Sequence, residues 1–269
     1  MTSPAKPAIA VTGASTGIGA ATARLLLDRG FAVIATVRKE SDGADLDARG
    51  ARVLLMDAAV RESVAAFAAA VGSAPLAGLV NNAGIAVPGP LEFISRDDLS
   101  RQFEVNVLGL MDVTRRLLPN LRQARGRIVN VSSIAGRSSL PMMGAYSASK
   151  FAVEALSDAL RVELRPWGMK VVLIEPGPVK TAIWGKGDGL VVPPEAEAMY
   201  GKLIALGRKV VARAERDGIA AEEVAEAIWR GLTLANPRAR YCMGPNTRVR
   251  RMLESLPAGL RDWVISRAI

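Results

Sequence analysis

The amino-acid sequence predicts a single domain of the α/β class. The chain has 269 residues, and one domain of that length buries about three quarters of the surface that its unfolded chain exposes. Short β-branched segments alternate with helical segments, and a glycine-rich turn joins the first strand to the first helix. Alternation of this kind predicts a doubly wound, Rossmann-type parallel sheet with helices on both faces.

About seven β-strands are expected in this sheet. Short apolar runs bounded by turn residues mark them, at residues 9–11, 32–37, 52–56, 79–80, 127–131, 170–174 and 240–243. Helices are expected at residues 20–29, 63–71, 97–122 and 145–165. Gly30 follows the first helix, at the position where a left-handed residue commonly ends a helix.

The single domain, residues 1–269, is predicted to have three parts. The regular alternation occupies residues 8–184, which form the expected core. Glycines and a proline pair then interrupt the pattern, and two or three helical stretches follow. Residues 185–216 are therefore expected to be an insert, and residues 217–269 the C-terminal helices, the last strand and a basic tail.

The composition excludes several kinds of catalytic site. The chain has no histidine, so it holds neither a Ser-His-Asp triad nor an imidazole-ligated metal, and we expect no metal site. Cys242, the single cysteine, cannot form an internal disulfide, and the N-terminus lacks an apolar signal, which together indicate a cytoplasmic protein. No apolar run reaches the roughly 18 residues of an integral membrane segment.

The net charge of +9 is concentrated near the C-terminus. Residues 237–269 carry seven arginines against two acidic residues. Val249, Met252, Leu253 and Leu256 recur at helical spacing beside these arginines, which indicates a helix docked on the domain with its arginines solvated. The alternative is that this basic tail binds an anionic membrane or a nucleic acid. Because the sequence shows no stripe of alternating aromatic and basic residues, we expect no nucleic-acid partner.

The turn after the first strand has the glycine spacing of a phosphate-binding loop. Its glycines permit a tight turn, and the helix that follows offers free N–H groups and the positive end of its dipole to a pyrophosphate. Three glycines alone are a weak signal, and an ordinary tight turn is the alternative. The residues expected to contact a cofactor here are Gly13, Ser15, Thr16, Gly17, Ile18 and Gly19.

The end of the second strand indicates which dinucleotide binds. Dinucleotide sites usually carry an acidic residue there for the ribose 2′-hydroxyl, but this strand is followed by Arg38 and Lys39. A guanidinium forms a planar, charge-assisted pair with a 2′-phosphate, which a carboxylate would repel. We therefore expect NADP(H) as cofactor, with a solvated basic loop as the alternative.

Small and polar residues follow the third and fourth strands. Asp57 is placed to accept a hydrogen bond from an adenine amino group. The Asn82 amide can tie strand ends together, and Ala83 and Gly84 leave room for a cofactor. Each of these is also a common turn residue.

A tyrosine and a lysine share one face of a predicted helix. Tyr146 and Lys150 lie four residues apart, a spacing that is also common in surface pairs. Three further features fall at the same end of the sheet or beside it, namely Asn106, Ser133 and the pair 176–177. Ligands bind at the carboxyl ends of the strands in such sheets, so the convergence favours a functional site.

These residues together resemble the short-chain dehydrogenase/reductase family, in its single-domain, NADP-preferring branch. The resemblance covers about the first 185 residues. It rests on T-G-x-x-x-G-I-G at 12–19, N-N-A-G at 81–84, Asn106, Ser133, Y-x-x-x-K at 146–150 and P-G at 176–177. The motifs follow one another in the family's order and at its distances.

The resemblance implies hydride transfer between a nicotinamide and a carbonyl or alcohol carbon. Tyr146 would donate a proton in reduction, or accept one as phenolate in oxidation. A free tyrosine has a pKa of about 10, so the Lys150 ammonium would stabilise the phenolate. Lys150 would also hold the nicotinamide ribose, Ser133 the substrate oxygen and Asn106 a relay water. Further cofactor contacts are implied at Pro176, Gly177, Val179 and Thr181.

The resemblance also bears on substrate and assembly. Residues 185–216 take the position of a substrate lid, and phrases such as that at 147–152 are similar to retinol and hydroxysteroid dehydrogenases, which implies a lipophilic alcohol or ketone. Apolar residues that either line its pocket or merely pack are Met142, Met143, Ile183, Trp184, Val191, Val192, Met199 and Leu203. A homodimer or homotetramer is implied. The alternative function is NADP(H) sensing without turnover.

Overall fold

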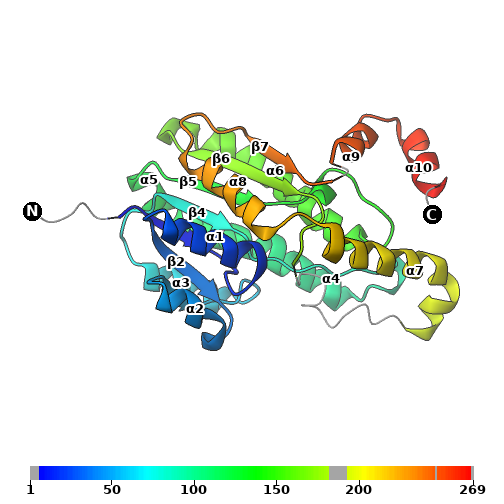
Figure 1. Ribbon diagram of the computed structural model, residues 1–269, viewed down its shortest axis with the longest axis horizontal. Helices are drawn as coiled ribbons and strands as arrows, with labels where there is room; N and C mark the ends of the chain where they lie inside the picture. Colours follow the sequence, from blue (N-terminus) through cyan, green and yellow to red (C-terminus); the bar gives the residue numbers. More distant parts are fainter. Residues whose placement is uncertain (1–5, 182–192, 246, 268–269) are drawn as a thin grey trace, which may run out of the picture.

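The computed structural model describes residues 6–181, 193–245 and 247–267, which form one α/β domain (Figure 1). Its single sheet has the strand order β3-β2-β1-β4-β5-β6-β7, and all neighbouring strands are parallel. The predicted doubly wound parallel sheet of seven strands is therefore confirmed. The strands are β1 (Ala8–Val11), β2 (Ala32–Val37), β3 (Arg52–Leu55), β4 (Gly78–Asn81), β5 (Arg127–Val131), β6 (Lys170–Pro176) and β7 (Arg240–Met243).

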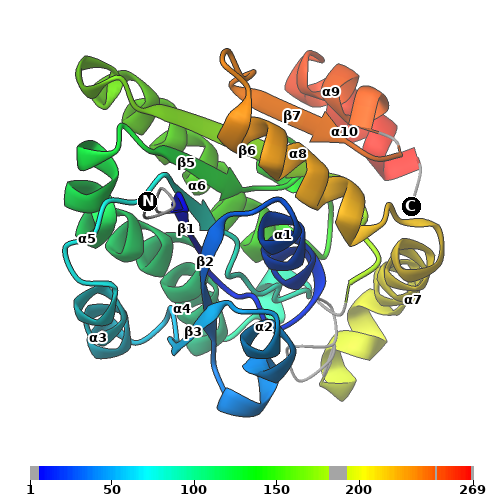
Figure 2. The same cartoon turned by 60° about the vertical axis from the view of Figure 1, so that its left-hand side comes forward.

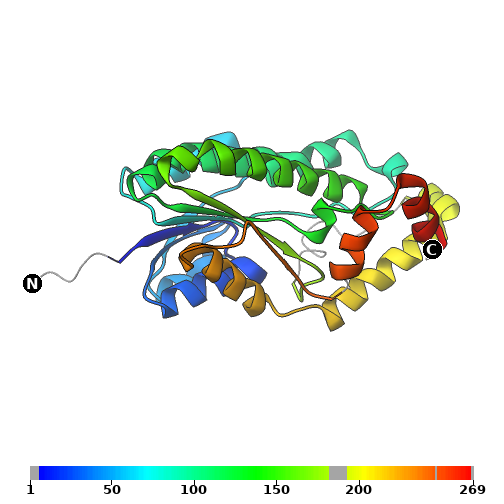
Figure 3. The same cartoon turned by 90° about the horizontal axis from the view of Figure 1, so that it is seen from above.

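Helices cover both faces of the sheet. Figure 3 shows α4, α5 and α6 on one side and α1 and α8 on the other, while α7, α9 and α10 lie beyond the carboxyl ends of the strands. The helices are α1 (Gly17–Asp28), α2 (Ala44–Ala48), α3 (Arg61–Val71), α4 (Arg96–Phe103), α5 (Leu110–Gln123), α6 (Gly144–Glu163), α7 (Pro194–Asp217), α8 (Ala221–Thr233), α9 (Thr247–Glu254) and α10 (Ala258–Arg267).

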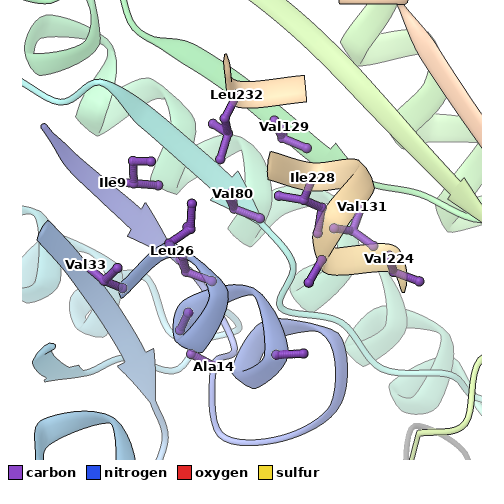
Figure 4. Packing of buried hydrophobic residues seen from close by; sticks show 14 of the residues in the cluster. Ile9, Ala14, Leu26, Val33, Val80, Val129, Val131, Val224, Ile228 and Leu232 are labelled. Carbon is purple, nitrogen blue, oxygen red and sulfur yellow. The ribbon is translucent and has the colours of Figure 1, made fainter. Parts of the chain in front are cut away.

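The core has one cluster on each face of the sheet. On one face, Leu26 of α1 and Ile228 of α8 are fully buried against Ile9, Val80 and Val129 of the strands (Figure 4). On the other face, α3, α5 and α6 contribute Phe67, Leu117, Leu121 and Leu160. Because both faces are covered, the central strands are continuous apolar runs rather than alternating ones.

Some predicted boundaries differ from the structure. The third strand ends at Leu55 instead of Met56, and the sixth continues beyond Ile174 to Pro176, which pairs with Met243 of β7. Short helices that were not predicted occur at α2 and, as 3₁₀ turns, at Glu40–Gly43, Leu91–Phe93, Ile134–Gly136 and Arg165–Trp167. Gly30 has a φ of 82° after α1, as expected for a residue that ends a helix.

The predicted long helix at 97–122 is interrupted. A π-helical segment, Glu104–Gly109, separates α4 from α5. Such segments are rare and widen the helix locally. Gly109 lies against Ala58, where an added Cβ would come within 2.1 Å of the Ala58 carbonyl oxygen. Asn106 occupies the middle of the segment, so the irregular turn directs a buried amide toward Ile85, in the loop after β4, and toward Ser149 of α6.

The C-terminal part is more helical than predicted. Two or three helical stretches were expected, whereas the described residues contain α7, α8, α9 and α10. Helix α7 runs through most of the expected insert because alanine, leucine, glutamate and lysine favour a helix there despite two glycines. Ile183, Trp184, Val191 and Val192, expected to line a pocket, lie outside the described residues.

The C-terminal helices dock on the domain. The Glu254 carboxylate of α9 accepts hydrogen bonds from Arg137 Nε at 3.1 Å, and Arg137 is also paired with the buried Glu175 of β6. This arrangement agrees with the docked-helix interpretation of the tail. Among the helices of the part that the structure describes, none has the length and apolar character needed to cross a bilayer.

We expect Leu26→Ala to lower the free energy of unfolding by about 2–5 kcal/mol, because the leucine is fully buried between α1, α8 and the sheet. Urea unfolding followed by circular dichroism measures the change. Leu55→Ala is the control, since Leu55 is 48% exposed on the edge strand β3 and should change the free energy by less than about 1 kcal/mol. Equal losses in both variants would contradict this account of the core.

Candidate functional site

The turn between β1 and α1 lies against the end of β4. Gly13 and Gly17 have φ values of 65° and 58°, in the left-handed region that favours glycine. A Cβ on Gly13 would come within 2.8 Å of the Ala83 Cα, and one on Gly19 within 2.5 Å of the Asn82 side chain. The glycines are therefore required by the close approach of the turn to the segment after β4.

Thr12 and Asn82 hold these two segments together. The Thr12 hydroxyl oxygen accepts hydrogen bonds from the backbone N–H groups of Asn82 and Ala83, each at 3.0 Å. In return the Asn82 amide donates to the carbonyl oxygens of Thr12 and Gly13, each at 3.0 Å. The Thr36 hydroxyl of β2 accepts a further bond from the Gly13 N–H at 3.1 Å. Three neighbouring strand ends are thus joined.

A groove crosses the carboxyl ends of β1, β2, β3 and β4. Most of the predicted cofactor-binding residues line it, namely Gly13, Ser15, Thr16, Gly17, Ile18, Arg38, Asp57, Asn82, Ala83, Gly84 and Thr181. Residues that line it without having been predicted are Thr36, Val37, Met56, Ala58, Ile85 and Val105. These residues belong to no sequence motif. The sequence could have indicated them only through the predicted residues that stand next to them.

Besides Tyr146 and Lys150, which are described below, four predicted cofactor-binding residues are not part of this lining. Gly19 packs behind the loop against Asn82. The Gly177 N–H donates to the Met243 carbonyl oxygen at 2.7 Å, and Pro176 pairs with that same residue in the sheet. Val179 is buried and pairs with Ile219. These four residues therefore pack against other segments of the chain and do not line the groove.

The groove has the features that a dinucleotide needs. Arg38 and Asp57 are the charged residues in its described lining, and Lys39 does not line it. The first turn of α1 contains no acidic residue, and Thr16 at its N-cap position has no side-chain hydrogen bond to the helix. The N-terminal N–H groups of α1 therefore remain directed toward the groove, where they favour an anion such as a pyrophosphate. The residues present fit a nicotinamide dinucleotide.

Tyr146 and Lys150 lie at one end of this groove, on the first turns of α6. Lys150 is 5% exposed, and its Nζ donates a hydrogen bond to the Val131 carbonyl oxygen of β5 at 2.9 Å. The Nζ atom lies 5.7 Å from the centre of the Tyr146 ring. A Cβ on Gly84, which lines the groove, would stand 3.8 Å from this Nζ. The ammonium therefore adjoins both the phenol and the groove.

Ser133 follows β5 on the same side. Its hydroxyl oxygen caps the 3₁₀ turn at Ile134–Gly136 by accepting from the Ala135 N–H at 3.1 Å. Ala135 packs with Ala86 and Tyr146 in a small buried cluster. The structure therefore brings Ser133, Tyr146 and Lys150 to one place, as the sequence predicts.

Asn106 is linked to α6 through a serine. Its Oδ1 accepts from the Ile85 N–H at 2.9 Å, and its Nδ2 donates to the Ile85 carbonyl oxygen at 3.0 Å and to Ser149 Oγ at 3.1 Å. Ser149 in turn donates to the Tyr146 carbonyl oxygen at 2.7 Å. Ser149 was not predicted, although its place inside the tyrosine–lysine motif was a signal. The amide thereby fixes the turn of α6 that carries Tyr146.

A buried acidic residue lies one helical turn beyond Lys150. Glu154 is 7% exposed, and burial raises its pKa to about 6. Its Oε2 lies 3.1 Å from Arg240 Nε of β7, which also pairs with Glu175 at 3.0 Å. Burial lowers the pKa of Lys150 to about 8, and the negative charge of Glu154 opposes that shift. Glu154 was missed because the sequence gives no sign that a helical glutamate is buried.

Comparisons with known proteins agree with this geometry. Residues 7–188 match the family model described as short chain dehydrogenase. An NADPH-dependent 3-dehydrocapnine reductase of Ornithobacterium rhinotracheale is 39% identical over 247 residues, covering 87% of each chain. Human retinol dehydrogenase 16 is 39% identical over 252 residues, covering 87% of this chain and 79% of its own.

Solved structures of similar proteins share the fold over almost the whole chain. A short chain dehydrogenase/reductase from Burkholderia phymatum in complex with NAD has a TM-score of 0.80 at 29% identity, covering 93% of this chain and 94% of its own. A short chain dehydrogenase from Burkholderia cenocepacia in complex with NADP has a TM-score of 0.75 at 29% identity, covering 96% and 97%. Nicotinamide dinucleotides of both kinds are thus bound among the structural neighbours.

We expect the free energy of unfolding of Tyr146→Phe to rise relative to that of the double variant Tyr146→Phe/Lys150→Met as the pH increases from about 8 to about 10.5. In this window the folded protein has lost the Lys150 proton, whereas the unfolded chain still binds it, so stability grows with pH by about 3 kcal/mol. Urea unfolding at a series of pH values measures the difference. Both proteins carry Tyr146→Phe so that they differ only at residue 150, and parallel pH curves would contradict the burial of an ammonium.

Proposed function

The chain belongs to the short-chain dehydrogenase/reductase family, and on that premise we propose that it is an NADP(H)-dependent oxidoreductase that interconverts a lipophilic ketone or aldehyde and its alcohol. One observation carries the proposal. The buried Lys150 ammonium stands 5.7 Å from the Tyr146 ring, at the end of a groove with the features of a dinucleotide site.

Tyr146 serves as the general acid and base in this proposal. In reduction its hydroxyl gives a proton to the substrate oxygen, and in oxidation its phenolate takes one. The Lys150 ammonium stabilises the phenolate because opposite charges attract strongly at a buried position. Ser133 Oγ donates a hydrogen bond to the substrate oxygen and so stabilises the charge that develops on it. Bound NADP(H) supplies or accepts the hydride.

Asn106 and Glu154 position these groups. Through Ser149, Asn106 fixes the turn of α6 that carries Tyr146. Glu154 favours the protonated form of Lys150 by its charge. As the pH falls below about 6, Glu154 gains a proton and this support weakens.

Arg38 supports a preference for NADP(H). It lines the groove just after β2, where a carboxylate would hold an unphosphorylated ribose. A relative that is 39% identical is named as NADPH-dependent, which supports the same preference. The relative named as a retinol dehydrogenase supports a lipophilic substrate.

We expect Tyr146→Phe to lose at least about a thousandfold in NADPH-dependent ketone reduction while it keeps its affinity for NADPH, because the proton donor is removed and the groove is left intact. Absorbance at the NADPH band measures turnover, and quenching of protein fluorescence measures cofactor binding. Retained turnover in this variant would show that Tyr146 is not the general acid and base. NADPH binding by the wild type without turnover of any carbonyl compound would favour the sensing alternative.

We expect Arg38→Ala to reduce the ratio of kcat/KM for NADPH to kcat/KM for NADH by roughly 10- to 100-fold. A factor of this size corresponds to the loss of one charge-assisted hydrogen bond to the 2′-phosphate. Lys39→Ala is the matched control, since the neighbouring cation does not line the groove, and its ratio should stay within about twofold of the wild type. A wild type that prefers NADH, or equal changes in the two variants, would contradict the assignment of Arg38.

A further inference from the structure

A second cavity, of about 740 Å³, lies beside the catalytic groups and beyond the carboxyl ends of the strands. Residues of α7, of the C-terminal helices α9 and α10, and of the loop before α6 line it. Figure 2 shows α7, α9 and α10 on the same side of the molecule. Its size is within the range of small-molecule sites. Among its described lining only Arg208 and Glu215 are charged, and the other residues are Pro88, Leu140, Pro141, Met142, Met143, Leu203, Leu206, Gly207, Val210, Val211, Ala212, Leu253, Val264 and Ile265.

This apolar chamber shares a wall with the candidate catalytic cluster. Met143 lines the chamber and also packs against the cluster that contains Tyr146. Its neighbour Met142 is 8% exposed and has a φ of 68°, which a methionine adopts only when the surroundings impose it. The Met142 carbonyl oxygen accepts from the Gly89 N–H at 2.8 Å. The strained turn places two adaptable thioether side chains on the chamber wall, and that of Met143 lies between the chamber and the cluster of Tyr146.

Gly207 keeps the chamber open. It lies inside α7, where glycine costs about 1 kcal/mol relative to alanine. Its φ is not in the left-handed region, and a Cβ at this position would meet only Met142 side-chain atoms, at ordinary contact distances of 3.8 to 3.9 Å. Neither the backbone nor close packing requires a glycine here. Because Gly207 has no side chain, space is left beside the Met142 side chain.

We propose that this chamber holds the flexible hydrocarbon chain of the substrate whose carbonyl group reacts at Tyr146. The inference rests on the proposed function and makes its substrate a long-chain ketone or aldehyde. A peptide segment fits less well, because its backbone N–H and C=O groups would find few partners on a lining with two charged side chains. A hydrocarbon chain has no polar groups to satisfy, and the methionines adapt to its shape.

The test compares straight-chain methyl ketones from butanone to tridecanone as substrates with NADPH. For the wild type we expect kcat/KM to rise about fourfold for each added methylene while the chain fills the chamber, corresponding to about 0.8 kcal/mol each. Gly207→Phe should abolish this rise and leave butanone within about twofold of the wild type. A flat chain-length profile in the wild type would overturn the proposal.

Gly201→Phe is the matched control. Gly201 lies in α7 directly after a kink at Tyr200, on the same side of the kink as Gly207. It does not line the chamber, and a Cβ added to it would meet no neighbouring atom within 4 Å. This variant should keep the wild-type profile, and loss of the rise in both variants would overturn the proposal. Ala212→Phe is a second filling variant at an exposed position of the lining, which tests the chamber even if Gly207→Phe does not fold.

Binding separates this inference from the proposed function. Isothermal titration of decanol into the full chain loaded with NADPH involves no turnover, because an alcohol and a reduced nicotinamide have no hydride acceptor. Burial of the decanol chain should give a negative heat-capacity change. Decanol binding to the wild type and Gly201→Phe, and at least tenfold weaker binding to Gly207→Phe, would support the chamber even if no ketone were reduced. Ketone reduction with equal decanol affinity in all three proteins would overturn the chamber and leave the proposed function standing.

Discussion

The hydrogen bonds between Thr12 and Asn82 hold together the two strand ends on which the site depends. The sheet order reverses at β1 and β4, so the connections leave these strands in opposite directions and a crevice opens between them. The Thr12 hydroxyl and the Asn82 amide close the base of that crevice with four bonds of 3.0 Å. These bonds fix the glycine turn against the segment that follows β4.

A buried charge is the second constraint. Lys150 lies in the interior with one backbone carbonyl as its hydrogen-bond partner, and the structure compensates by placing Glu154 one turn away. Glu154 is itself costly to bury, and Arg240 offsets its charge. Arg240 belongs to β7. The last strand of the sheet therefore affects the charge of Glu154, and through Glu154 that of Lys150. Charges that are buried without such partners would shift their pKa values until they were neutral.

The two halves of the site are built differently. Glycines shape the groove, together with hydrogen bonds from the side chains of Thr12, Thr36 and Asn82 to the backbone. The apolar chamber is formed by methionine, leucine and valine side chains on helices and loops beyond the sheet. Side-chain packing of this kind changes its shape with small substitutions. Tyr146 and Met143 lie where the two halves meet.

Much of the fold and of the candidate site was predictable from sequence because it depends on local signals. Alternating strand and helix patterns determined the parallel sheet, glycine spacing determined the loop, and the four-residue spacing of Tyr146 and Lys150 determined their common helical face. The π-helical segment, the buried Glu154 and the chamber around Gly207 were decided only by tertiary structure. Each depends on residues far apart in the chain: Gly109 against Ala58, Glu154 beside Arg240, and α7 beside Met142. A linear pattern records which residues are apolar or charged, but burial and enclosure arise only when distant segments pack together.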